Sequence, residues 1–180
     1  MVIETKRLIL REMTLDDQKD ICNIVADPET MKFYRKEFLE QYALKWITWN
    51  LDNYKKYGFG LWAIILKETG ELIGDCGITI QRIDGELLPE IGYHIHKNFW
   101  RQGYGKEAAA AVRDWGFNNT KYNCLYSYMT SDNVPSYSTA ASIGMKKIKE
   151  YLPEGDEEGM LSVYAITKQE WELLNNNWIS

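Results

Sequence analysis

The segment that decides the fold is Trp100-Arg101-Gln102-Gly103-Tyr104-Gly105-Lys106, which follows a strand-like apolar run and precedes a helical pattern. Its glycines let the backbone approach a ligand closely, and the first N–H groups of the following helix are free to bind one. The helix dipole adds about half a positive charge at that end. Arg101 and Lys106 add full positive charges, so the segment is predicted to bind a phosphate or pyrophosphate group.

Other interpretations of this turn fit less well. A Walker A loop needs a glycine where Trp100 stands and a serine or threonine where Glu107 stands. A dinucleotide fingerprint fits the spacing Gly103-x-Gly105-x-x-Ala108 better, but the next strand-like run lacks the acidic residue expected about 20 positions later. A tight strand–helix turn without any ligand is the remaining alternative.

Patterns before and after the turn predict the fold class. The expected elements are, in order, a strand over 2–11, helices over 14–26, 29–34 and 38–57, strands over 59–66, 72–81 and 88–96, a helix over 103–118, a strand over 124–130, a helix over 133–142, strands over 145–152 and 160–166, and a helix from 167. Three consecutive strands with short links form an antiparallel meander. The prediction is an α/β fold with a mixed, mostly antiparallel seven-stranded sheet and helices on both faces.

The composition limits the number of domains, the partners and the location that are expected for this chain. A chain of 180 residues, 45% hydrophobic and 26% charged, predicts one globular domain over residues 1–180. The net charge of −5 argues against nucleic acid as a partner. Cys22, Cys76 and Cys124 are odd in number and lack metal-ligand spacing, which predicts reduced thiols and a cytoplasmic location. No apolar run approaches the ~20 residues of a membrane span, so no membrane association is expected.

Several segments together resemble one known family. They are Glu90-Ile91-Gly92-Tyr93, Phe99 to Ala108, Thr5 to Arg11, Gly74-Asp75-Cys76-Gly77, Asp132 to Ser136, and Ile143-Gly144-Met145. The first two resemble the acetyl-CoA motif of the GNAT acetyltransferase superfamily. Taken in their order along the chain, all of them are similar to segments of one branch, the bacterial Rim-type acetyltransferases, which modify the N-termini of ribosomal proteins. The resemblance implies a GNAT-like fold whose sheet splays between its fourth and fifth strands.

The resemblance also implies acetyl-CoA as the acyl donor, without a metal. The pantetheine arm would pair with the end of the fourth strand, at His94, Ile95 and His96. The pyrophosphate would bind the N–H groups of residues 101–106, that is, Arg101, Gln102, Gly103, Tyr104, Gly105 and Lys106. Asn133 and Ser136 would lie beside the arm and the thiol. Where many members place a tyrosine general acid, this chain has Ala140.

Glu90 is the candidate general base, because it lies on the strand that enters the cofactor turn. Strand alternation places Glu90, Gly92, His94 and His96 on one face. The alternatives are that Glu90 is an exposed charge at a strand end and that His94 is the base. The two histidines resemble half of a metal site, but no third ligand is evident in the sequence.

The leaving thiolate needs a proton or a hydrogen bond, for which Ser136 and Tyr137 are the candidates. Ser136 also fits an ordinary role in a helix turn. The aromatic residues of the helical pattern 38–57, with Phe33, Tyr34, Phe38 and Trp62, are expected either to line the acceptor side or to form core.

The predicted function is an N-acetyltransferase acting on a primary amine, which is either a protein N-terminus or a small molecule. A non-catalytic acyl-CoA-binding sensor and a dinucleotide-dependent oxidoreductase are the alternatives. The sequence leaves the acceptor open, and it leaves open whether the chain forms a homodimer.

Overall fold

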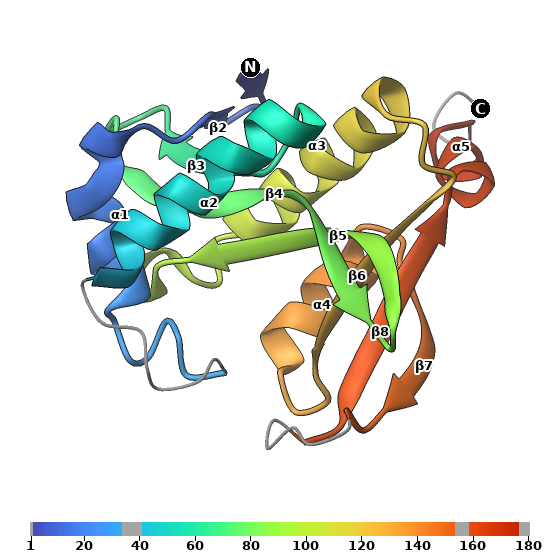
Figure 1. The fold of residues 1–180 in the computed structure, drawn as a ribbon. Helices are drawn as coiled ribbons and strands as arrows, with labels where there is room; N and C mark the ends of the chain where they lie inside the picture. The colour runs from blue at the N-terminus through green and yellow to red at the C-terminus, as the bar shows by residue number, and fades with distance from the viewer. Residues whose placement is uncertain (1, 34–40, 154–158, 177–180) are drawn as a thin grey trace.

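The computed structural model describes residues 2–33, 41–153 and 159–176, and one twisted sheet runs through it (Figure 1). The eight strands lie in the order β1-β2-β3-β4-β5-β6-β8-β7. They are β1 (Val2–Glu4), β2 (Leu8–Arg11), β3 (Leu61–Leu66), β4 (Leu72–Ile83), β5 (Glu86–Ile95), β6 (Cys124–Thr130), β7 (Lys146–Tyr151) and β8 (Leu161–Thr167). All neighbouring strands are antiparallel except β5 and β6, which confirms the predicted mixed, mostly antiparallel sheet.

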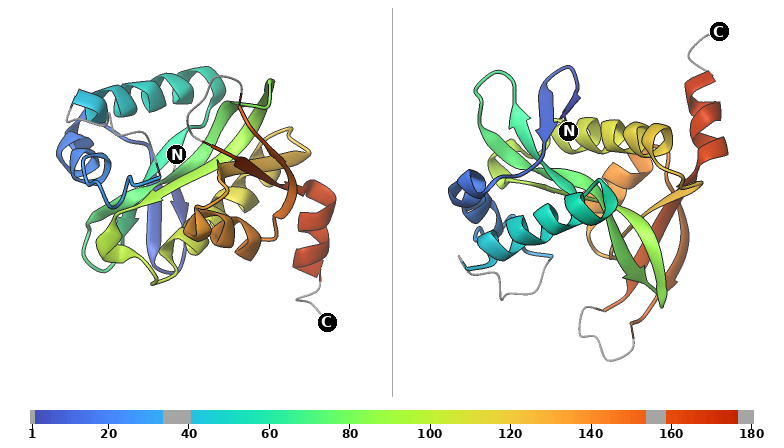
Figure 2. Two further views of the ribbon diagram at one scale, coloured as in Figure 1. Left: turned by 90° about the horizontal axis from the view of Figure 1, so that it is seen from below. Right: turned by 45° about the horizontal axis from the view of Figure 1, so that its top comes forward.

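Helices cover both faces of the sheet (Figure 2). They are α1 (Gln18–Val25), α2 (Gln41–Tyr57), α3 (Tyr104–Asn119), α4 (Val134–Ser142) and α5 (Lys168–Asn176), with single 3₁₀ turns at Leu15–Asp17 and Lys97–Phe99. Residues of α1 and α2 pack with β3 in one hydrophobic cluster. A larger cluster joins α3 and α4 to the other face. Of the described helices, none is long and apolar enough to cross a membrane.

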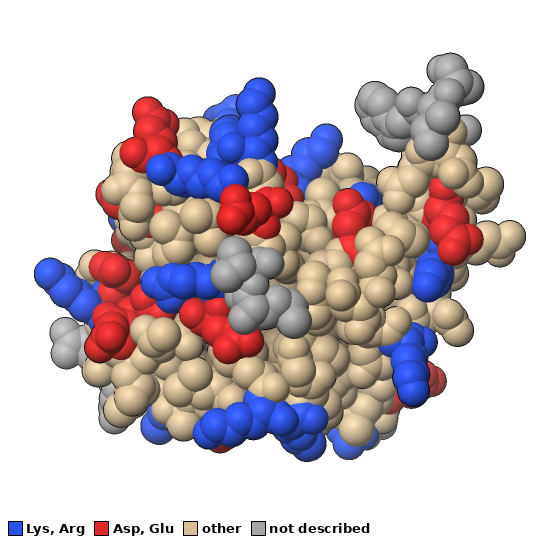
Figure 3. All heavy atoms as spheres, turned by 90° about the horizontal axis from the view of Figure 1, so that it is seen from above, with Lys and Arg blue, Asp and Glu red and all other residues tan. Residues whose placement is uncertain are grey.

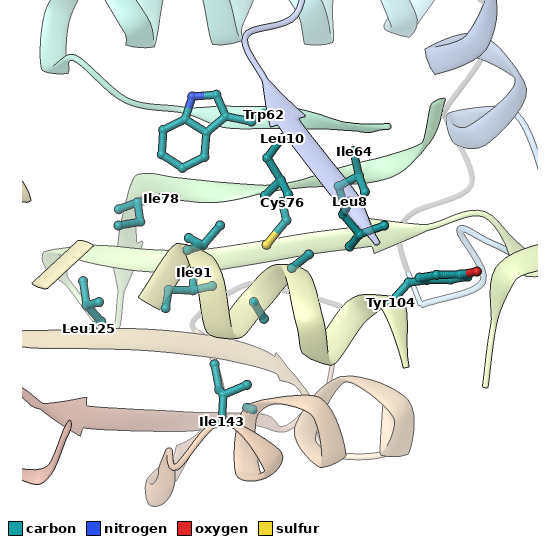
Figure 4. Packing of buried hydrophobic residues seen from close by; sticks show 14 of the residues in the cluster. Leu8, Leu10, Trp62, Ile64, Cys76, Ile78, Ile91, Tyr104, Leu125 and Ile143 are labelled. Atoms are coloured by element: carbon teal, nitrogen blue, oxygen red, sulfur yellow. The ribbon is translucent and has the colours of Figure 1, made fainter. Parts of the chain in front are cut away.

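The larger cluster contains Trp62, which was considered for the acceptor side (Figure 4). Its ring is 1% exposed and meets Trp115 of α3 edge to face, with ring centroids 4.8 Å apart. Trp62 is therefore a core residue. Its neighbour on β4, Cys76, is fully buried in the same cluster.

The strand predicted over residues 2–11 is instead a hairpin, which raises the strand number from seven to eight. Val2 pairs with Arg11 across it, and the chain reverses at residues 5–7. The reversal is closed by the Thr5 N–H, which donates to Leu8 O at 3.0 Å. Only the second half of the segment has the alternating burial of a strand that faces the core.

The short helix predicted over 29–34 is not formed in its described part, residues 29–33, which are turns. Asp27 Oδ1 accepts the Thr30 N–H at 2.7 Å, and Asp27 O accepts the Met31 N–H at 3.0 Å. These bonds close a turn around Asp27 without continuing into a helix. Tyr34 and residues 38–40, the predicted start of the next helix, lie outside the described residues.

The sheet opens between β5 and β6, the fourth and fifth strands of the sequence prediction. Within the described residues these two strands have one paired position, Glu90 with Tyr126. Beyond it, the strands diverge toward the end of β5 (Figure 1). The predicted fold class, a GNAT-like sheet that opens at this point, is confirmed.

Candidate active site

A cavity of about 500 Å³ lies at the opening between β5 and β6. Glu90, Tyr93 and His94 line it from β5, and Asn133 and Ser136 line it from the start of α4. The helix α2 contributes three aromatic rings, Phe33 contributes a fourth as expected for the acceptor side, and the strands β3, β4, β6 and β8 complete the wall. The cavity therefore joins the two faces of the sheet at the point where the strands separate.

Glu90 lies in this wall and is 9% exposed, which excludes its being a solvated charge at a strand end. Thr79 Oγ1 donates to Glu90 Oε2 at 3.1 Å. Burial raises the pKa of Glu90 to about 7, against the opposing effects of Thr79 and His94. A carboxyl group with this pKa can accept a proton near neutral pH and release it again.

His94 lies on the same face as Glu90 and is held by Asp75 of β4. The distance from His94 Nδ1 to Asp75 Oδ1 is 2.7 Å. The second oxygen, Asp75 Oδ2, accepts the Trp46 indole N–H at 2.9 Å. Burial lowers the pKa of His94, but the charge and hydrogen bond of Asp75, with Glu90, raise it above its usual value.

Ser136 reaches the cavity from the other face, at the first turn of α4. Its Oγ donates to the Tyr93 hydroxyl at 3.3 Å, and that hydroxyl donates to Ser136 O at 2.7 Å. Asn133 Oδ1 accepts the Ser136 N–H at 3.2 Å, so it caps the helix. Burial raises the pKa of Tyr93. A hydroxyl pair thus stands opposite the Glu90 carboxyl group.

Tyr137 and Tyr93 lie in places that the sequence does not predict. The Tyr137 ring stacks on Tyr164, with centroids 6.4 Å apart, and among the described residues the cavity lining does not include it. Tyr93 does line the cavity and was missed. Its place in the Glu90–Tyr93 motif was a usable signal, but alternation assigned it to the face opposite Glu90. Because the cavity lies where two strands separate, side chains from both faces of the sheet reach it.

The turn at 100–106 is fixed at its start and at its end. The Trp100 indole N–H donates to Ile95 O at 2.6 Å, which ties the turn to the end of β5. Gly103 adopts the left-handed conformation, with φ of 81°, and caps α3. The first helical bond runs from Glu107 N to Gly103 O at 3.0 Å. The N–H groups of residues 104–106 therefore precede the helical ladder and have no intrahelical acceptor.

The turn is also fastened to the β1–β2 hairpin. Glu107 accepts hydrogen bonds from Thr5 Oγ1 at 2.6 Å, Arg7 N at 2.8 Å and Arg7 Nε at 2.6 Å. Arg7 Nη1 also donates to Gln102 O at 2.9 Å. Burial raises the pKa of Glu107, but the bonds from Thr5 and Arg7 hold it below its usual value. The acid beside the predicted anion site is thus offset by an arginine.

The end of β5 presents its backbone groups alternately to its two neighbours. The His96 N–H donates to Ile73 O at 2.9 Å, toward β4. Strand alternation then directs the backbone groups of Tyr93 and Ile95 toward the opening, and those of His94 toward β4. The His96 ring lies near Phe99, with centroids 6.3 Å apart, and outside the cavity.

Two observations concern the partners of this chain, namely the distribution of surface charge and the arrangement of side chains that could bind a metal ion. On the face shown in Figure 3, acidic and basic side chains are interspersed, without a continuous basic track. Among the described residues, no group of three or more His, Cys, Asp or Glu side chains is arranged to hold a metal ion.

Comparison with known proteins gives one family. Residues 7–146 match the acetyltransferase (GNAT) domain. The chain is 36% identical to the uncharacterized protein YkkB of Bacillus subtilis over 142 residues, which is 78% of this chain and 83% of that protein. It is 31% identical to the uncharacterized N-acetyltransferase YnaD of Bacillus subtilis over 95% of this chain and 99% of that protein.

Solved structures show the same fold. An acetyltransferase from Agrobacterium tumefaciens has a TM-score of 0.78 and 29% identity, covering 93% of this chain and 95% of that chain. A putative ribosomal-protein-serine acetyltransferase from Vibrio cholerae has a TM-score of 0.75 and 24% identity, covering 93% and 97%. The second likeness concerns the fold alone, and it places Rim-type proteins among the structural neighbours.

Proposed function

Because this chain belongs to the GNAT acetyltransferase family, we propose that it transfers the acetyl group of acetyl-CoA to a primary amine bound in the cavity between β5 and β6. The observation that carries this proposal is the buried Glu90 carboxyl group in the cavity wall. A buried carboxylate costs stability, so its presence at the opening favours a role in the reaction.

The acceptor amine must lose a proton before it attacks a thioester. At pH 7 this costs roughly 4–5 kcal/mol for a lysine-like amine of pKa about 10.4, and about 1 kcal/mol for an α-amine. Glu90 is proposed to take this proton, directly or through a water molecule, before the free amine attacks; the new N–C bond then forms and the C–S bond of the thioester breaks. His94 is less suited to the role, because Asp75 holds its Nδ1 and raises its pKa.

The leaving sulfur of the donor is proposed to receive a hydrogen bond from the Ser136 hydroxyl, whose proton turns from the Tyr93 oxygen to the sulfur, while Tyr93 keeps its bond to Ser136 O. Ser136 was a sequence candidate for this role, and Tyr93 supports it because the two hydroxyls are hydrogen-bonded at 3.3 Å. Tyr137 is not proposed, since its ring packs on Tyr164 instead. Asn133 supports the pair by capping α4 at Ser136.

The donor is proposed to lie along the end of β5 and the turn at 100–106. The outward backbone groups of Tyr93 and the outward N–H of Ile95 suit the amides of the pantetheine arm, whereas Ile95 O already accepts the Trp100 indole N–H. The N–H groups of residues 104–106 suit the pyrophosphate, with Arg101 and Lys106, both exposed, adding charge. Gly105 leaves room for close approach, because a Cβ there would meet only Ile95 Cγ1, at 3.7 Å.

Two other interpretations are less well supported. An acyl-CoA-binding sensor has no need of a buried carboxyl group at the acceptor side. A dinucleotide-dependent oxidoreductase is expected to have a parallel doubly wound sheet. In the described part of this sheet, the one parallel pair is β5, the strand that leads into the turn at 100–106, with β6. The acceptor itself stays between a protein N-terminus and a small-molecule amine, because the fold does not specify it.

The test is an acetyl-transfer assay with a panel of amines, in which release of the free thiol is followed. Glu90→Gln is expected to lower kcat/KM by about 10²–10⁴, the usual contribution of a general base, while CoA affinity is retained. Glu86→Gln, an exposed glutamate at the start of the same strand, is the matched control. Unchanged turnover in Glu90→Gln would exclude Glu90 as the base, and CoA binding without transfer to any amine would favour the sensor.

A further inference from the structure

Asp75 is a charged residue inside the protein whose role the proposed reaction does not explain. It is 0% exposed, and both of its carboxylate oxygens are engaged, one by His94 Nδ1 and one by Trp46 Nε1. Burying a carboxylate is costly unless it is paired and hydrogen-bonded. The pairing with His94, at 2.7 Å, gives Asp75 its compensating cation only if the imidazole is protonated.

Trp46 fixes this pair from the side of α2. Its indole N–H donates to Asp75, and its ring meets the His94 ring edge to face, with centroids 5.3 Å apart and planes at 76°. Trp46 and His94 both line the cavity. The pair is therefore oriented by a residue of the cavity wall, and its histidine faces the proposed site of reaction.

Gly92 separates His94 from Glu90 along β5. The Glu90 carboxylate lies over this glycine, since a Cβ built at position 92 would be 3.0 Å from Glu90 Oε2 and 3.4 Å from Oε1. The three residues occupy alternate positions on one face of the strand. The missing side chain lets the carboxylate extend along the strand toward His94.

Within residues 2–33, 41–153 and 159–176, few other charged groups face Asp75, His94 and Glu90. Tyr42 and Lys45 of α2, Tyr93 of β5 and Tyr128 of β6 share the cavity, and Tyr54 and Cys76 lie near Asp75. Tyrosine and cysteine side chains never carry a positive charge. Lys45 is exposed to solvent, so its charge is screened. Among the residues that the structure describes, His94 is thus the buried group that can offset the charge of Glu90.

From this arrangement we infer that Asp75 and His94 are positioning residues, in which Asp75 holds His94 as an imidazolium and that cation keeps the buried Glu90 ionised. The inference rests on the proposed function only for its effect on catalysis. It agrees with the opposing effects on the pKa of Glu90, which is raised by burial, lowered by the Thr79 hydrogen bond and by His94, and raised to a lesser extent by Asp75. Without the cation, a larger fraction of Glu90 would be protonated at neutral pH and unable to accept a proton.

The direct test measures charge states without turnover. In protein labelled at the glutamate carboxyl carbons and the histidine rings, NMR titration reports both groups, and Glu90→Gln assigns the carboxyl signal. The chain has two histidines, so His96→Gln leaves His94 as the one ring to follow. We expect an imidazolium signature for His94 in the native protein at pH 7. A neutral ring there would overturn the inference even if every variant of the pair failed to fold.

Two variants then test the linkage. His94→Gln is expected to raise the pKa of Glu90 by about one unit, the usual effect of losing a nearby opposite charge. Asp75→Asn is expected to lower the pKa of His94 by a similar amount. An unchanged Glu90 titration in folded His94→Gln would overturn the inference.

Catalysis gives the second readout. In His94→Gln the acidic limb of the kcat/KM profile should move to higher pH with the pKa of Glu90, whereas a purely structural role lowers the rate at every pH equally. If NMR shows the linkage and no amine is acetylated, the proposed function fails and this inference stands. If amines are acetylated but neither the Glu90 titration nor the acidic limb moves, the inference fails alone.

Discussion

The donor side and the acceptor side of this cavity are built in different ways. On the donor side, the turn at 100–106 presents backbone N–H groups, held by the left-handed Gly103 and by the Arg7–Glu107 contacts. On the acceptor side, the wall presents side chains from separate elements, among which Glu90 is buried, and the buried Asp75 lies behind the wall, bonded to His94 and Trp46. A backbone site is sensitive to added Cβ atoms, whereas a side-chain site is sensitive to altered charge. Different substitutions should therefore weaken CoA binding on the donor side and turnover on the acceptor side.

The largest effect on stability is expected on the acceptor side. The pKa of Glu90 is about 7 in the folded protein against 4.5 in the unfolded chain, so the folded state binds more protons between these values. Stability therefore falls as pH rises through this window. Glu90→Gln should remove the fall and be more stable than the native protein by up to about 3 kcal/mol at pH 8. Urea unfolding of both proteins from pH 4 to 8 measures this, and parallel curves would contradict it.

Gly92→Ala should affect the acceptor side alone. The new Cβ would be 3.0 Å from Glu90 Oε2, so the carboxylate must move away. Displacement of a catalytic group by about 1 Å can reduce turnover by about 100-fold, and that loss of kcat is expected with CoA affinity unchanged. Gly85→Ala, at the β4–β5 turn with φ of 85° and open space around it, is the control that costs stability without lowering kcat. A raised CoA Kd in Gly92→Ala would mean that the two sides are not separable.

Gly105→Ala should affect the donor side alone. The added Cβ meets only Ile95 Cγ1, at 3.7 Å, so the fold accepts it, and alanine favours the helix by up to about 1 kcal/mol. The methyl group would hinder approach of the pyrophosphate to the N–H groups. Loss of one such charged hydrogen bond corresponds to about a tenfold rise in Kd. Calorimetric titration with CoA and a thermal melt measure the two quantities, and an unchanged Kd would place the pyrophosphate elsewhere.

The smallest effect concerns the arginine behind the turn. Arg7→Met leaves the Glu107 charge uncompensated in the first turn of α3, which should raise the Kd of CoA by up to about fivefold at low salt. Adding Glu107→Gln should restore most of the affinity. The four proteins of this double-mutant cycle, titrated at two salt concentrations, give the coupling. Additive effects would show that Arg7 supports the turn independently of the Glu107 charge, for example through its bond to Gln102 O.

The difference between a donor side built from one segment and an acceptor side built from several explains what could be predicted from the sequence. The turn is local, so its glycines and the strand–helix change were visible in one segment, and the order of elements followed from hydrophobic periodicity. Asp75 was not a candidate, because its partners His94 and Trp46 are 19 and 29 residues away. Nothing in the spacing of these residues indicates that a β4–β5 register and a helix on that face bring them together.

Two further differences also have causes in residues that are distant along the chain. The hairpin at residues 5–7 was read as one strand, because the glutamate that stabilises its turn, Glu107, is supplied by α3. Tyr137 is a candidate from the sequence, whereas Tyr93 is not considered there. The contact between Tyr93 and Ser136 forms across the opening, where Glu90 pairs with Tyr126, and this is tertiary information.

The order of the strands around the opening allows the chain to be cut into two fragments. All strands on one side of the opening come from residues 2–95, and all strands on the other come from residues 124–167. The backbone crosses from one block to the other once, through α3 and the segment that follows it. A cut at residues 120–123 would therefore yield two fragments, each with its own set of consecutive strands. Their reassembly would depend on the α3 and α4 packing, and it would offer a split reporter of donor binding.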